Sequence, residues 1–169
     1  MAVTSTTETN YEQLASGAHG GAQVKGFCRQ VIAPAASTQT LTKAQSGALC
    51  LFNSAAGVVF TLPTIDEAAD IGMNFEFLVT TSVTSNAHKV ITGAATEFLV
   101  GGIIMGDVTV AQSGDYFEAN GTSHVEISGE GSTTGGLLGE RYEVTAVSLT
   151  QWAINGVCHG AGTLADPFG

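Results

Sequence analysis

Positive charge is scarce in this sequence. The chain of 169 residues has 5 Lys and Arg against 15 Asp and Glu, so its formal net charge is −10. Only 12% of the residues are charged, whereas about 25% is usual in soluble domains. Proteins bind nucleic acids through cations that displace counterions from phosphates, so we expect no nucleic-acid partner. Apolar residues still make up 44%, which argues against a disordered chain.

Long apolar runs and paired cysteines are also missing. The longest apolar run, 98–105, is interrupted by two glycines, whereas a membrane helix needs about 20 residues. The first residues are polar and lack the pattern of a secretory leader, so we expect no membrane partner. Three widely spaced cysteines, Cys28, Cys50 and Cys158, predict neither a disulfide framework nor a metal knuckle.

Good helix formers are few, because Gly, Thr, Val and Ser dominate the chain. From Val24 onward, short apolar and Thr-rich runs are separated by Gly, Ser or Asn clusters, which is typical of strands and turns. Met73, Phe75, Phe77 and Val79 occupy alternate positions, which predicts a strand with one buried face. We predict strands at 24–32, 39–42, 48–53, 58–62, 73–80, 89–92, 98–100, 107–111, 116–119, 124–128, 141–148 and 151–155. This pattern predicts an all-β fold, either a β-sandwich or a jelly-roll-like barrel.

The two ends of the chain differ from this pattern. We predict an extended N-terminal arm at 1–23, a β domain at 24–160 and a short C-terminal tail at 161–169. Each end has isolated apolar side chains, namely Tyr11 and Leu14 in the arm and Leu164 and Phe168 in the tail. Loose segments with such anchors can cover surface beyond their own domain. These four residues are therefore the predicted partner contacts.

A faint internal repeat indicates one hairpin used twice. The segment 114–118 is followed by Val-x-Ile-x-Gly at 125–129, and 139–143 is followed by Trp-x-Ile-x-Gly at 152–156. Asn120 and Gly121 form the expected turn of the first hairpin. Stacked hairpins explain the repeat as architecture, without a binding function.

The sequence contains few groups of residues that could bind a metal or perform catalysis together. His124 and Glu126, two residues apart, would lie on one face of a strand and could bind a metal or orient a general base. A catalytic metal site needs about three protein ligands, and no third ligand is near in sequence. A solvent-facing pair is the favoured interpretation. We therefore predict no catalytic residues, no metal site and no cofactor.

Two further features have similarly simple explanations. Five carboxylates lie in 107–130 without any Lys or Arg. They could bind cations, but a solvated acidic face is the favoured interpretation. Cys158 and His159 are adjacent but lack an acidic partner, whereas a thiolate nucleophile needs a base held by an orienting group.

Several segments together resemble the small capsid decoration proteins, also called cement or head-stabilising proteins, of tailed bacteriophages. The similarity runs from about 39 to 160 and includes a Leu-Pro pair at 62–63 and Gly-x-x-Phe-x-Phe at 72–77. The segments concerned are 40–47, 58–63, 72–79, 114–118, 120–122 and 151–156. The chain departs from the pattern at Val125, where the first hairpin commonly has an aromatic residue.

The resemblance implies a structural virion protein without enzymatic activity. It implies a homotrimer that is made in the host cytoplasm, decorates the outer capsid surface and stabilises it by binding major capsid protein subunits. An alternative is a carbohydrate- or receptor-binding β module of a head or tail fibre, which would use Trp152 and Tyr116 to bind a glycan. An enzyme using His124 and Glu126 is the third hypothesis.

Overall fold

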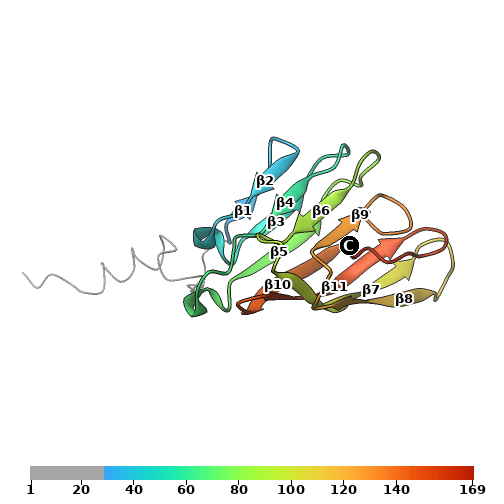
Figure 1. Cartoon of the computed structure of the whole chain (residues 1–169). Coiled ribbons are helices and arrows are strands. Elements are labelled where there is room, and N and C mark those ends of the chain that lie inside the picture. Colours follow the sequence, from blue (N-terminus) through green and yellow to red (C-terminus); the bar gives the residue numbers. More distant parts are fainter. Residues whose placement is uncertain (1–28) are drawn as a thin grey trace, which may run out of the picture.

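The computed structural model describes residues 29–169. These residues form strands and two single-turn 3-10 helices (Figure 1). The elements are β1 (Val31–Ile32), β2 (Thr38–Thr40), η1 (Lys43–Gln45), β3 (Leu49–Phe52), β4 (Val59–Thr61), η2 (Ala68–Asp70), β5 (Asn74–Val79), β6 (His88–Ile91), β7 (Phe98–Asp107), β8 (Gly114–Asn120), β9 (Glu126–Gly129), β10 (Arg141–Ser148) and β11 (Gln151–Gly160).

The strands form two mixed sheets that pack together, which confirms the all-β sandwich. Sheet A has the order β1-β3-β5-β10-β11-β7-β8, and sheet B has the order β2-β4-β6-β9. From β1 to β6 the chain alternates between the sheets, so that each strand lies parallel to the previous one in its sheet. This parallel winding distinguishes the fold from a jelly roll, whose strands are antiparallel.

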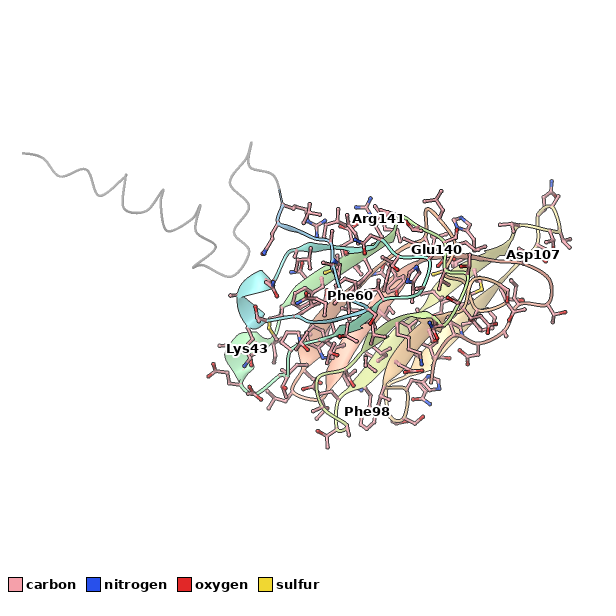
Figure 2. All side chains as sticks on the ribbon, turned by 90° about the horizontal axis from the view of Figure 1, so that it is seen from above. Lys43, Phe60, Phe98, Asp107, Glu140 and Arg141 are labelled. Carbon is pink, nitrogen blue, oxygen red and sulfur yellow. The ribbon has the colours of Figure 1, made fainter. Side chains whose placement is uncertain are left out.

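The core lies between the sheets. The predicted buried face of β5 is confirmed, because Met73, Phe75, Phe77 and Val79 are each at most 8% exposed. Phe60 from sheet B reaches Phe77 of sheet A with 5.4 Å between ring centroids. It lies in the interior in Figure 2, whereas Asp107 lies at one end of the molecule. Aromatic contacts of this kind join the two layers and make the sandwich a stiff body.

Two predicted strand boundaries are wrong around the glycines of β7. The strand continues to Asp107 instead of ending at 100, and 108–112 forms a bend and turn instead of continuing a strand. Gly101 continues the strand with a φ of 109°, and a Cβ there would lie 2.5 Å from the carbonyl oxygen of Ile154 on β11. Glycine therefore permits the close approach of β11 and does not interrupt β7.

The prediction of a hairpin used twice is correct for one of its two copies. The second copy is confirmed, because β10 pairs antiparallel with residues 151–157 of β11. The first copy is wrong, because β8 pairs with β7 in sheet A whereas β9 pairs with β6 in sheet B. Asn120 instead shapes the crossing between the sheets, where its side-chain oxygen accepts bonds from the amides of Thr122 and Ser123.

The C-terminal tail is held against the domain beside β9, where Figure 1 marks the end of the chain. The carbonyl of Pro167 accepts a bond from the Ser128 amide, and Gly169 exchanges backbone hydrogen bonds with Glu126. Phe168 is 8% exposed, and Leu164 packs partly buried against the core. The two apolar side chains predicted as outward anchors thus contact their own domain instead.

Replacing Phe168 with alanine should lower the free energy of unfolding by about 2 to 3 kcal/mol, toward the low end for a large aromatic side chain because the site is at the rim. Urea titration followed by tryptophan fluorescence measures this. Thr163→Ala, at an exposed position in the same tail, should change stability by less than about 0.5 kcal/mol. Equal effects of the two substitutions would contradict a structural role for Phe168.

Candidate functional site

The outer face of sheet A has a line of six side chains, one from each of six strands, of which five are apolar. The pairing registers align Leu51, Leu78, Arg141, Val157, Ile104 and Tyr116 along one line. We call the five apolar members of this line the apolar row. Val157, Ile104 and Tyr116 are 53%, 57% and 62% exposed. Exposed apolar side chains gathered in one patch mark interaction surfaces more often than scattered ones.

Acidic groups border the apolar row. The neighbouring line on the same face contains Glu76, Glu143 and Glu118. Glu76 is nearly buried and forms ion pairs with Arg29 and Arg141. Glu143 and Glu118 are exposed and have no ion-pair partner among the described residues. The half of this face around Val157, Ile104 and Tyr116, which we call the open half, is therefore apolar in the middle. It is negative along one side, where Glu118 and Glu143 lie.

A second candidate is a small buried pocket between the sheets at the start of β10. It is lined by Val79, His88, Ile127, Gly129, Thr134, Gly136, Glu140, Tyr142 and Cys158. Four of these residues are titratable, and clusters of perturbed titratable groups are typical of active sites. The hydrogen bonds of each group decide whether it is available for chemistry.

Glu140 is held in a cradle of backbone amides. Its carboxylate accepts bonds from Gly136 (2.8 Å), Leu137 (3.0 Å) and His159 (3.1 Å), and its side chain is only 2% exposed. Burial raises the pKa of Glu140, and the three amide donors act in the opposite direction. The glycine-rich loop therefore binds an anion that belongs to the protein itself. The carboxylate fixes the loop and is not aimed at a substrate.

His88 bridges two loops as a neutral imidazole. Its Nδ1 accepts a bond from the Val58 amide (3.2 Å), so Nε2 carries the proton and donates to the Thr81 carbonyl (2.9 Å). Burial lowers the pKa of His88, and the Thr81 carbonyl offsets this only partly. Both ring nitrogens are thus used in the fold, and neither is free for acid–base catalysis or metal binding.

The cysteines of the described chain are buried thiols. Burial raises the pKa of Cys50 to about 12 and that of Cys158 still higher. Only the thiolate is a nucleophile, so neither residue is activated. Cys50 and Cys158 are thus free thiols that pack as small buried side chains.

Stability should decrease on acidification below pH 6.5 because of His88. The folded state binds its proton more weakly than the unfolded state does, so unfolding takes up a proton as the pH falls through 6.5 toward the lowered pKa. In His88→Gln this contribution disappears, and the difference in unfolding free energy between wild type and variant should shrink from pH 8 to pH 5.5. Guanidinium titrations across this range measure it, and a constant difference would contradict the assignment.

The two residues of the predicted His124–Glu126 pair have different partners in the structure. His124 precedes β9, accepts a bond from the Asn120 amide (3.2 Å) and stacks on Phe168 with 5.8 Å between ring centroids. Glu126 forms an ion pair with Lys89 at 2.7 Å. Within 29–169, no group of three or more His, Cys, Asp or Glu side chains could hold a metal ion.

The other predicted residues have diverse environments. Tyr11 and Leu14, like Cys28, lie outside the described residues. Trp152 is completely buried, so the glycan-binding role that the alternative hypothesis gave it is wrong. The apolar row itself was missed. Period-two alternation marks which residues of a strand share a face, but the lateral neighbours follow only from the sheet order.

No protein-family model, curated protein or solved structure matches the chain. The described part of the chain has no helix of the length and apolarity that a membrane span requires.

Proposed function

We propose that this protein is a structural virion component that decorates a phage capsid. It would bind major capsid protein subunits as a homotrimer on the outer surface of the shell and stabilise their contacts. The sequence resemblance supplies the virion context. The observation that best supports a binding role is the apolar row, which a stiff sandwich presents to solvent.

The buried polar groups favour binding over catalysis. Among the described residues, every buried side-chain nitrogen and oxygen has a hydrogen-bond partner. Of the pocket residues, Glu140 and His88 use their polar atoms to bind backbone groups of the surrounding loops. A site prepared for chemistry keeps a nucleophile or base free to meet its substrate. We therefore assign the function to the surface of the molecule.

A decoration role also fits the physics of a shell. A protein that binds only the assembled form shifts assembly by mass action. The shell repeats the same site many times, so modest affinity at each site is sufficient when neighbouring copies also touch. The predicted arm at 1–23, with Tyr11 and Leu14, would extend contact to an adjacent subunit.

Undecorated shells of the encoding virus test this proposal. The full chain should sediment with the shells and saturate at a fixed ratio to the major capsid protein. The shells should then resist heat better. A chain lacking residues 1–21 should bind more weakly if the arm contributes. Absence of the protein from mature particles, or no binding of the full chain to shells, would overturn the proposal.

A glycan-binding module remains the second candidate. Tyr116 favours it, because its ring is 62% exposed beside the carboxylate of Glu118 on the same strand. An exposed aromatic ring can stack on a sugar while a nearby carboxylate accepts its hydroxyl bonds. Saturable binding on a glycan array that Tyr116→Ala abolishes would favour this function over decoration.

A further inference from the structure

We propose that the open half of the outer face of sheet A docks a protein surface in which apolar side chains are flanked by Lys or Arg. The docking surface comprises Val157, Ile104 and Tyr116 of the apolar row together with Glu118 and Glu143. This inference deepens the proposed function and rests on it. It names the face that binds and the chemistry of the partner.

The three apolar residues form a continuous strip. Val157 on β11 is in register with Ile104 on β7, and Ile104 is in register with Tyr116 on β8. All three are more than half exposed, whereas Leu51 and Leu78 at the other end of the row are partly covered. A rigid aromatic ring beside aliphatic side chains is the usual composition of an interface centre.

Tyr116 is positioned by the backbone beneath it. A Cβ at Gly102 would lie 2.5 Å from the Tyr116 hydroxyl and 2.3 Å from the carbonyl of Phe117. The tyrosine ring therefore lies across Gly102 on β7 instead of pointing freely into solvent. An anchor that is already ordered loses less conformational entropy on binding.

The unpaired carboxylates beside the strip indicate a partner with positive charge. All cations of the described residues are engaged: Arg29 and Arg141 pair with Glu76, Lys43 with Asp66 and Asp70, and Lys89 with Glu126. Beside the strip, Glu118 and Glu143 have no cationic partner within 29–169. A partner that supplies Lys or Arg at the border would neutralise them, and complementary potentials fix orientation and exclude wrong partners.

A second copy of the chain fits this face poorly. Two such faces in contact would bring Glu118 and Glu143 toward identical carboxylates. No described part of the chain offers an unpaired cation to relieve this repulsion. We therefore assign the face to a different protein, and contacts within a homotrimer to other surfaces.

Titration of the isotope-labelled full chain with short peptides, followed by NMR, tests the chemistry of the face. The probe is an amidated peptide of alternating lysine and valine. Alternating glutamate–valine and lysine–threonine peptides serve as comparisons. The lysine–valine peptide alone should bind, and its largest shifts should fall on amides of β7, β8 and β11. Shifts confined to other elements, or equal binding of the three peptides, would overturn the inference.

Matched variants sharpen the result. Glu118→Lys and Ile104→Thr should each weaken binding by about tenfold or more. Glu130→Lys and Leu149→Thr alter an exposed carboxylate and an exposed apolar side chain away from the face, and should leave affinity unchanged. Sedimentation should give the same oligomeric state for wild type and Ile104→Thr. An oligomer that this substitution converts into folded monomers would show that a second copy occupies the face, which would overturn the inference.

The shell assay separates the two proposals. If shells bind wild type and Ile104→Thr equally, decoration stands and the docking face is wrong. If the peptide pattern holds but shells bind neither protein, the face stands and decoration is wrong.

Discussion

Replacing Trp152 with alanine should lower the free energy of unfolding by about 3 to 5 kcal/mol, the range for large aromatic side chains in cores. Trp152 is completely buried and lies 6.3 Å from Phe75 between ring centroids. Its indole N–H donates to Glu97 at 3.0 Å, and the other oxygen of Glu97 accepts the Ile65 amide at 2.7 Å. The substitution therefore opens a cavity and removes one partner of a buried carboxylate.

Trp152→Phe separates the two contributions. Phenylalanine keeps most of the volume but cannot donate to Glu97, so we expect a loss of about 1 to 3 kcal/mol. Denaturant titration followed by far-UV circular dichroism suits both variants, because the only tryptophan is the residue replaced. A loss below about 1 kcal/mol for alanine would contradict the core position of Trp152.

The burial of Trp152 also changes how a glycan experiment must be interpreted. Loss of sugar binding in Trp152→Ala would report partial unfolding, since the ring cannot reach a ligand. Tyr116→Ala is the informative substitution, because Tyr116 is exposed and its removal opens no cavity. The same variant also removes the aromatic anchor of the proposed docking surface, so only the glycan readout distinguishes the two functions.

Local patterns in the sequence predicted the features that depend on a single strand, such as which of its faces is buried. Alternation identified the buried face of β5, and Trp152 with Ile154 on β11 obeys the same rule. Strand order could not be predicted this way, because the parallel pairs of β1 to β6 join residues that are distant along the chain. The apolar row from Leu51 to Tyr116 becomes visible only when these strands are laid side by side.

Buried polar residues were missed for a related reason. Glu97, Glu140 and His88 read as surface residues by type, yet each is at most 2% exposed. Their burial is tolerated because backbone amides, a carbonyl or an indole N–H satisfy them. The partners of Glu97, and the Val58 amide that binds His88, are at least 30 residues away in the sequence. Glu140 differs, because two of its three amide donors lie only three and four residues before it. For Glu140 the sequence signal is the glycine pair at 135–136 shortly before it, since such a pair can turn backbone amides toward an anion.

Among these buried polar residues, Glu140 gives the clearest test. Replacing it with alanine should lower the free energy of unfolding by about 3 kcal/mol or more. Three amides lose their acceptor at once, and a buried donor left unpaired costs about 1 to 3 kcal/mol. Glu140→Gln should cost less, because one amide oxygen can replace Oε1 and accept from Leu137 and His159. Its NH₂ group would face the Gly136 amide, so donor would oppose donor. Urea titration at pH 7 gives both values.

The raised pKa of Glu140 determines how the stability difference between wild type and Glu140→Gln changes with pH. The folded state holds the Glu140 proton more tightly than the unfolded state does. As the pH rises from about 4.5 through the raised pKa, unfolding therefore releases a proton and wild type loses stability relative to Glu140→Gln. The advantage of wild type over this variant should thus be larger at pH 4.5 than at pH 8. Glu130→Ala, at an exposed loop position, should shift stability by less than about 0.5 kcal/mol. An equally small effect of Glu140→Ala would show that the glycine-rich loop does not depend on the carboxylate.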